Sequence, residues 1–136
     1  MQAIDTNILV YAHDRSAGQK HSRAKQLVGD IWVRRTGCLS VQVLQEFFVT
    51  VTQMVAKPLE VESAARIIAD LATWHVYAPD ANDVLDAIQI QKRCQLSFWD
   101  AMIVGSAMQL GCQTLWTEDL NAGQLLENVT IVNPFL

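Results

Sequence analysis

The stretch QAIDTNILVYAHD, residues 2–14, places one aspartate between two apolar segments of different character. The residues that end at Asp5 predict a short buried strand, and the residues that follow predict a helix that begins near Thr6 or Asn7. A strand that leads directly into a helix is the repeating unit of α/β domains. This stretch therefore predicts an α/β fold if the rest of the chain repeats the unit.

The rest of the chain does repeat it. Further strands are expected at residues 38–40, 75–78, 113–117 and 129–132. Helices are expected at residues 18–35, from a Ser40 cap to about Val55, and at 59–73, 81–95 and 98–110. Short apolar strands that alternate with helices favour a mostly parallel sheet covered by helices on both faces. We therefore expect a three-layer α/β/α fold, and 136 residues suit one domain spanning 1–136.

The charge is distributed unevenly along the chain. The net charge is −4, but residues 1–36 carry six Lys or Arg against three Asp or Glu (+3), and residues 37–136 carry four against eleven (−7). The basic residues of the first part are Arg15, Lys20, Arg23, Lys25, Arg34 and Arg35. Such a group is either a local nucleic-acid contact or a solvated helix face, and charge alone favours the helix face.

Tryptophans occur in segments with a clear apolar pattern. The expected helix at 18–35 carries an apolar stripe of residues at helical spacing: Ala24, Leu27, Val28, Ile31 and Trp32. Trp99 and Trp116 flank candidate site residues, and we interpret them as core residues rather than as surfaces for base stacking.

Several classes of protein find no support in the sequence. Cys38, Cys94 and Cys112 have no close spacing and predict reduced thiols, and the histidines form no HExxH motif for zinc. Glycine-rich nucleotide loops, a GK[ST] lysine and a recognisable serine or cysteine nucleophile motif are all missing. No apolar run is long enough to span a bilayer, and the N-terminus is a poor signal peptide. A soluble cytoplasmic protein is therefore expected.

Four carboxylates are expected to meet at one edge of the predicted sheet. Asp5 and Asp119 follow the ends of two strands, Asp100 lies in the first turn of a helix, and Glu46 lies in the second turn of another. The C-terminal ends of parallel strands share one edge, and ligand sites of α/β sheets gather there.

Each carboxylate also has a purely structural interpretation. Asp5 fits a helix cap, and Ser97 with Asp100 has the spacing of a capping box. Glu46 shares a polar stripe with neighbouring helix positions, namely Gln42, Thr50 and Gln53, and Glu118 with Asp119 fits an acidic turn. The functional interpretation therefore depends on the joint placement of the four residues.

A cluster of carboxylates has a predictable chemistry. Like charges repel one another, so that some of the groups hold protons unless a cation lies among them. Oxygen ligands in this number suit Mg²⁺ or Mn²⁺, which bind phosphates and help to form a hydroxide nucleophile. The pattern thus favours a metal-dependent phosphoryl-transfer or hydrolytic site.

The segments that carry these residues resemble the four signature segments of PIN domains, and most closely those of the VapC-like toxins of bacterial toxin–antitoxin pairs. The segments are IDTNILVYAHD (4–14), LSVQVLQEFF (39–48), FWDAMIVGSA (98–107) and LWTEDL (115–120). They come in the family's order and at suitable spacing. The resemblance implies the PIN-like α/β/α fold and a Mg²⁺- or Mn²⁺-dependent ribonuclease that uses water as the nucleophile.

By this resemblance, Asp5, Glu46, Asp100 and Asp119 match the acidic positions that hold the metal. Thr6 and Thr117 match hydroxyl positions beside the site, and Asn7 is expected to orient Asp5. Glu118 stands next to Asp119 and competes with it for the fourth position. The family also implies an RNA substrate, a homodimer and a small cognate antitoxin. Arg15, Lys20 and Arg23 are then candidates for holding the RNA backbone.

Two other functions remain open at this point. The first is a PIN-like module that binds nucleic acid or acts as a scaffold and cuts nothing. The second is another phosphoryl-transfer enzyme, such as a haloacid-dehalogenase-like phosphatase or a receiver domain. The phosphatase needs a second carboxylate where this chain has Asn7, and the receiver needs a late lysine that is absent after residues 113–117.

Overall fold

The computed structural model describes residues 1–136, and its centre is a six-stranded sheet of order β3-β2-β1-β4-β6-β5. The strands are β1 (Gln2–Ile4), β2 (Gly37–Ser40), β3 (His75–Tyr77), β4 (Thr114–Trp116), β5 (Leu125–Leu126) and β6 (Val129–Val132). All neighbouring strands are parallel except β5 and β6. The mostly parallel sheet that the sequence predicted is confirmed.

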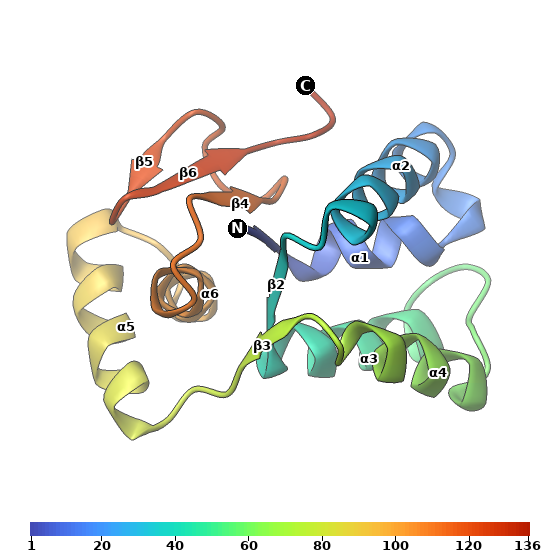
Figure 1. The fold of residues 1–136 in the computed structure, drawn as a ribbon, viewed down its shortest axis with the longest axis horizontal. Helices are drawn as coiled ribbons and strands as arrows, with labels where there is room; N and C mark the ends of the chain where they lie inside the picture. The colour runs from blue at the N-terminus through green and yellow to red at the C-terminus, as the bar shows by residue number, and fades with distance from the viewer.

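Helices cover both faces of the sheet. They are α1 (Thr6–His13), α2 (Gln19–Arg34), α3 (Val41–Gln53), α4 (Val61–Leu71), α5 (Ala81–Cys94) and α6 (Phe98–Gln109), with a short 3₁₀ helix, η1 (Arg15–Ala17). Figure 1 shows α1, α2, α3 and α4 on one side of the sheet and α5 and α6 on the other. This is the expected three-layer α/β/α arrangement.

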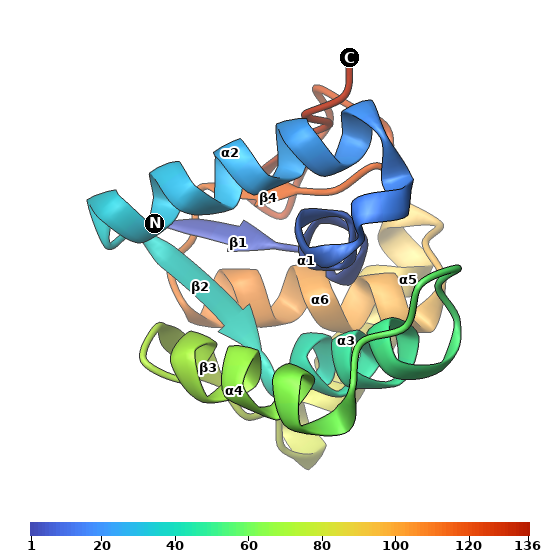
Figure 2. The same cartoon turned by 90° about the vertical axis from the view of Figure 1, so that its right-hand side faces the viewer.

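The connections bring the helix starts to one edge of the sheet. Figure 2 shows β1 and β2 running side by side in the same direction, with β1 leading into α1 and β2 into α3. The Ser40 hydroxyl caps α3 by accepting a hydrogen bond of 3.2 Å from the Val43 N–H, as its position in the sequence predicted. The edge at which these strands end therefore carries the residues that follow Ile4 and Ser40.

One strand escapes the sequence pattern. β5 has two residues and forms an antiparallel hairpin with β6 through Glu127 and Asn128, whose φ angles are 50° and 71°. Two positive φ angles are what a two-residue type I′ hairpin requires, but the usual Asn-Gly or Asp-Gly signal is absent here. A strand this short shows no alternation, and the sequence therefore gave no reason to expect it.

The core lies on both sides of the sheet. Its largest fully buried side chains include Ile4, Leu9, Leu39, Phe47, Leu115 and Ile131. Helix α6 is apolar around most of its circumference because it packs against the sheet on one side and α5 on the other, and Ala101, Ile103 and Val104 are all buried. None of the helices combines the length and the hydrophobicity that crossing a bilayer requires.

The apolar stripe of α2 is buried with one exception. Ala24, Leu27, Val28 and Ile31 lie in the core, but Trp32 is 41% exposed. The last turn of α2 extends beyond the start of β2, and the core therefore offers no cover for the indole there. Trp32 instead packs at an angle against Trp74, with 5.3 Å between the ring centroids.

Gly37 is required by the packing of Trp74. A Cβ atom at Gly37 would lie 2.2 Å from Cε3 of the Trp74 indole, whereas a Cβ at Gly29 in α2 would meet no atom within 4 Å. We expect Gly37→Ala to lower the free energy of unfolding by about 1–3 kcal/mol through overpacking. Gly29→Ala is the matched control, which should be neutral or stabilising because alanine favours helices. Urea denaturation of both variants tests this, and equal stability of the two would contradict it.

Candidate active site

A cavity of about 320 Å³ lies at the C-terminal edge of β1 and β4. All four carboxylates that the sequence singled out line it: Asp5, Glu46, Asp100 and Asp119. The remaining lining residues are Thr6, Asn7, Val10, Tyr11, Thr50, Trp99 and Ile103. Four segments that are distant in sequence thus supply acidic side chains to one cavity.

Asp5 is the most deeply buried of the four, with 4% of its surface exposed. It is the N-cap of α1, and its carboxylate accepts hydrogen bonds from the Thr6 N–H at 2.7 Å and the Thr117 hydroxyl at 2.7 Å. Its pKa is raised from 3.8 to about 6, mainly by burial; the two hydrogen bonds lower the pKa, and the charges of Asp119 and Asp100 contribute to the rise. Asp5 thus caps the helix with one oxygen and carries a charge that the protein alone stabilises poorly.

Glu46 is held by two side chains. The Thr6 hydroxyl donates to one carboxylate oxygen at 2.7 Å, and the Gln42 amide donates to the other at 2.8 Å. Gln42 also donates to the Trp99 carbonyl at 3.3 Å and is only 8% exposed. The part of the polar stripe that contains Gln42 and Glu46 therefore faces the cavity and is not plain surface.

Asp100 lies in the first turn of α6 but does not complete a capping box. Its N–H donates to the Ser97 hydroxyl at 3.1 Å, but the return bond from the Ser97 N–H to the Asp100 carboxylate is absent. The box is complete at α5, where Asp80 and Asp83 bond reciprocally. Burial raises the pKa of Asp100, the Ser97 hydroxyl opposes this, and the charges of Asp119 and Glu46 add to it. The cap therefore uses the Asp100 backbone and leaves its carboxylate in the cavity.

Asp119, and not Glu118, supplies the fourth carboxylate. Asp119 accepts a hydrogen bond from the Asn7 amide at 2.9 Å, and its own N–H donates to the Thr117 hydroxyl at 3.1 Å. Glu118 does not line the cavity and instead accepts bonds from the Tyr11 hydroxyl at 2.5 Å and the Lys20 ammonium at 2.7 Å. Adjacent residues after β4 thus have opposite orientations and different partners.

A comparison with family models decides what this site belongs to: the model of the PIN domain matches residues 3–125. The chain belongs to the PIN domain family. A comparison with curated protein sequences found no match.

Solved structures of similar fold span nearly the whole PIN domain. A toxin–antitoxin complex from Klebsiella pneumoniae is 18% identical, with a TM-score of 0.73, and the match covers 98% of each chain. The Mycobacterium tuberculosis toxin VapC20, described as cleaving the sarcin–ricin loop, is 19% identical over 85% of this chain and 87% of its own, with a TM-score of 0.65. VapBC2 from Rickettsia felis, bound to a promoter DNA fragment, is 17% identical over 96% of both chains, with a TM-score of 0.64. At these identities the likeness shows the fold.

The predicted supporting residues of the PIN domain lie beside the carboxylates, with one different pairing. Thr6 contacts Glu46, and Thr117 contacts both Asp5 and the Asp119 backbone. Asn7 was expected to orient Asp5, but its amide donates to Asp119 instead. The structure thus assigns Asn7 to the fourth carboxylate, while Asp5 is held by the Thr6 N–H and the Thr117 hydroxyl.

The three basic candidates lie outside the cavity lining. Lys20 pairs with Glu118 and lies over the Tyr11 ring, 5.0 Å from its centroid. Arg23 donates through Nε to the Pro134 carbonyl at 3.1 Å. Arg15 is exposed on η1 and makes no ion pair. Contact of these residues with RNA stays a prediction.

Sequence reasoning missed three residues that shape the cavity. Of the three, only Gln42 could have been found from the sequence, because it lies four residues before Glu46 and therefore on the same face of the helix. Tyr11 lines the cavity and fixes Glu118, a contact between residues 107 apart that no local pattern announces. Trp99 was expected in the core but is 62% exposed at the cavity rim, while Trp116 is half-buried and donates to Gln2 at 2.9 Å.

The donor set of this cavity fits a hard divalent cation. As the side chains stand, no group of three or more His, Cys, Asp or Glu is arranged so that it could hold a metal ion. The chemistry nevertheless matches, because four carboxylates share one cavity and two of them have raised pKa values. Two buried amide oxygens, Asn7 Oδ1 and Gln42 Oε1, also lack a hydrogen-bond partner. Both belong to side chains that position the acidic residues, Asp119 and Glu46 respectively.

Proposed function

We propose that this PIN domain is a Mg²⁺- or Mn²⁺-dependent endoribonuclease that hydrolyses RNA phosphodiester bonds. The observation that carries the proposal is the convergence of Asp5, Glu46, Asp100 and Asp119 on one cavity at the C-terminal edge of the sheet. Mutual repulsion and burial make this arrangement unfavourable for the protein alone, and a divalent cation would relieve both. The family to which the chain belongs supports the nuclease chemistry.

The four carboxylates are the residues that would hold the cation. When bound, such an ion lowers the pKa of a water molecule and neutralises charge on a substrate phosphate. Asp5 would be its most constrained ligand, because Thr6 and Thr117 restrain both of its oxygens. Glu46 is similarly restrained by Thr6 and Gln42. The protein's part is therefore to fix the positions of the oxygen donors before substrate arrives.

Water is the proposed nucleophile because the cavity offers no better one. No Ser, Cys or His lines it, and the Thr6 hydroxyl donates to Glu46. Raised pKa values at Asp5 and Asp100 also place two carboxyl groups closer to neutrality than free aspartate. A bound divalent cation would oppose this effect, so that both groups would serve it as ionised ligands.

The biological role that we propose is that of the toxin in a type II toxin–antitoxin pair. The supporting observation is that structures similar over nearly the whole chain are toxins or toxin–antitoxin complexes. A small antitoxin is then the proposed protein partner and RNA the substrate. A homodimer is also proposed, and exposed apolar side chains on α5 and α6 support it: Val84, Leu85, Ile88 and Met108.

One observation favours a second candidate function, a non-catalytic nucleic-acid-binding module. The carboxylates do not form a ready metal site as they stand, and a module of this kind needs none. It predicts no cleavage under any condition and no stabilisation by metal.

Cleavage of a structured RNA pool by the purified protein separates the two functions. The pool should include a sarcin–ricin loop, and the reactions contain Mn²⁺, Mg²⁺ or excess chelator. We expect cutting with metal, none with chelator, and a metal-induced rise in melting temperature. Glu62→Gln is the matched control, because Glu62 is an exposed acid on α4 that lines none of the cavities described. If the protein neither cuts the RNA nor is stabilised by metal, the result favours the binding module.

A further inference from the structure

A second and larger cavity lies at the opposite edge of the sheet. Its volume is about 580 Å³, and Gly37 and His75, which line it, are the first residues of β2 and β3. The carboxylate cavity lies at the other ends of the strands, beyond Ile4 and Trp116. The two cavities are therefore separate sites, and none of the nuclease residues lines the larger one.

The larger cavity presents an aromatic surface to solvent. Trp32 and Trp74 line it and pack edge to face, with an interplanar angle of 63°. The Trp74 indole lies directly on the backbone of Gly37, where a Cβ would collide with it. Trp74 is therefore held in place by its contact with Gly37, and it packs against Trp32, which is 41% exposed. A supported and exposed ring of this kind is a stacking platform.

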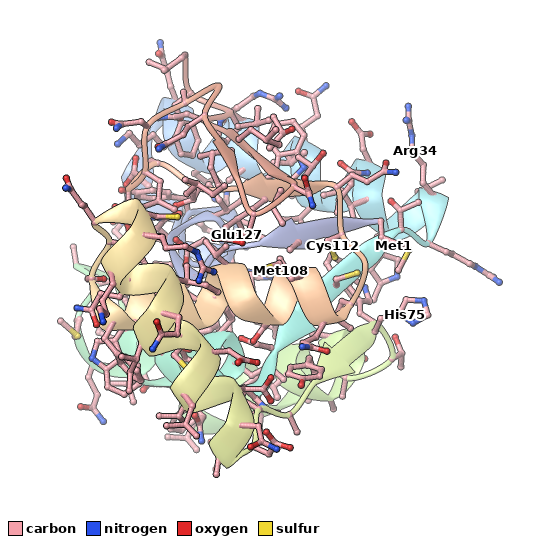
Figure 3. All side chains as sticks on the ribbon, turned by 90° about the vertical axis from the view of Figure 1, so that its left-hand side faces the viewer. Met1, Arg34, His75, Met108, Cys112 and Glu127 are labelled. Atoms are coloured by element: carbon pink, nitrogen blue, oxygen red, sulfur yellow. The ribbon has the colours of Figure 1, made fainter.

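The same cavity is cationic in a chain of net charge −4. Arg35 lines it, and no Asp or Glu does. Figure 3 shows Arg34 and His75 projecting from the same end of the molecule, away from the sheet. The only two salt bridges involve Lys20 and Arg93, which leaves Arg34 and Arg35 without a carboxylate partner.

The backbone of Arg35 is itself unusual. It ends α2 in the left-handed conformation, with φ 57°, and this position usually carries glycine. A non-glycine residue there is strained, because its Cβ atom lies close to the following carbonyl oxygen. This turn places Arg35 just past the end of α2, where it lines the cavity.

We propose that this aromatic and cationic cavity is an auxiliary binding site for single-stranded RNA. A base stacks on Trp32, and an adjacent phosphate binds Arg35. A single strand of RNA presents planar bases that alternate with anionic phosphates. Proteins bind such a strand with aromatic side chains that stack on the bases and cationic side chains that contact the phosphates. An acidic peptide could pair with Arg35, but its Asp and Glu side chains have no planar ring that stacks on Trp32. The proposal rests on the proposed ribonuclease function and deepens it, because it assigns a place for substrate outside the cleavage site.

Helix α2 connects the two sites. Its 16 residues correspond to roughly 24 Å of helix. Arg35 follows its last residue, and Lys20, near its start, contacts Glu118 beside Asp119. An RNA strand that lies along α2 reaches both cavities. The auxiliary site therefore holds nucleotides several positions away from the bond that is cut, and it should act on KM rather than on kcat.

The test measures binding without cleavage. A fluorescein-labelled oligoadenylate of about twelve nucleotides, within the range of single-strand sites, is titrated against protein in the Asp100→Asn background with chelator present. In this background Trp32→Ala should raise the Kd about tenfold, and Trp32→Phe should restore most of the affinity. Arg35→Ala should weaken binding severalfold and lower its salt dependence. Arg66→Ala, which removes an exposed cation on α4, is the control and should change nothing.

Equal affinity of the Trp32, Arg35 and Arg66 variants would overturn the proposal. So would a result in which RNA affinity is unchanged but binding of an oligoglutamate peptide depends on Trp32 and Arg35, since that outcome assigns the cavity to a protein. Circular dichroism confirms that each variant is folded. Because nothing is cut in this assay, its failure is distinct from failure of the nuclease proposal, which the metal-dependent cleavage assay decides.

Discussion

Replacing Asp100 by asparagine is expected to abolish RNA cleavage and leave the fold intact. The change removes one charge from the carboxylate cavity, and a metal site that loses a charged ligand forfeits several kcal/mol of charge stabilisation. That loss corresponds to a rate at least about 100-fold lower. The measurement is the cleavage rate of the same RNA by wild type and variant at saturating Mn²⁺, with Glu62→Gln as the charge-matched control.

The fold should survive because the cap of α6 does not use the carboxylate. Ser97 accepts its hydrogen bond from the Asp100 N–H, which asparagine keeps, and the Ser97 N–H makes no return bond to the side chain. Burial raises the pKa of Asp100 because it disfavours the charged carboxylate, and neutral asparagine does not bear this cost. Melting curves by circular dichroism should therefore nearly coincide. A folded variant that still cuts at the wild-type rate would remove Asp100 from the site, and an unfolded one would make it a structural residue.

The fold was predictable because its signals are local. The change from a short apolar strand to a helix at Asp5 recurs at Ser40, and each change is marked by a residue that caps the helix. Parallel pairing then places these positions at one edge regardless of the details. The convergence of Asp5 and Glu46 follows from topology alone.

The partners within the site were not predictable, because they depend on side-chain directions across long sequence separations. Asn7 follows Asp5 by two residues but bonds to Asp119, 112 residues away. Glu118 and Asp119 are adjacent acids, and their contacts separate them: Tyr11 and Lys20 hold Glu118, whereas Asn7 holds Asp119 in the cavity. Strand register and side-chain rotamers determine such contacts, and neither can be recognised from a periodic pattern in the sequence.

The auxiliary cavity escaped prediction for a related reason. Spacing alone placed Trp32 in the apolar stripe of α2, with Ile31. Ile31 is indeed buried, but Trp32 lies at the margin of the core, where it is 41% exposed and packs against Trp74. A periodic pattern shows which face a residue occupies, but it does not show how far the neighbouring sheet extends.

Asp5→Asn should stabilise the metal-free protein at neutral pH and abolish cleavage. The folded pKa of Asp5 is about 6, above its ordinary value of 3.8, so the folded state binds the proton more tightly than the unfolded state. Stability therefore falls as pH rises from about 4 to 6 and stays low above that range. At pH 7.5 this penalty is on the order of 3 kcal/mol, since a tenfold change in proton affinity corresponds to about 1.4 kcal/mol.

Asparagine removes the penalty and can keep the hydrogen bonds. Its carbonyl oxygen can still accept from the Thr6 N–H, and its amide can donate to the Thr117 hydroxyl, which rotates to accept. We expect the variant to melt several degrees above wild type at pH 7.5 in chelator. The gap should narrow toward pH 4, where the wild-type carboxyl is protonated. Asp70→Asn, at an exposed position on α4, is the control and should show neither effect.

Metal should reverse the order of the two proteins. Wild type gains stability as Mg²⁺ or Mn²⁺ binds the ionised carboxylates, by an amount that grows with metal concentration, while Asp5→Asn gains little. The melting temperatures then cross as metal is added, and the more stable protein in chelator is the inactive one. A cost in the metal-free state that disappears on binding is what distinguishes a site built for a cation from a buried cap. If Asp5→Asn is less stable than wild type in chelator at pH 7.5, the capping hydrogen bonds outweigh the charge, and Asp5 serves the fold first.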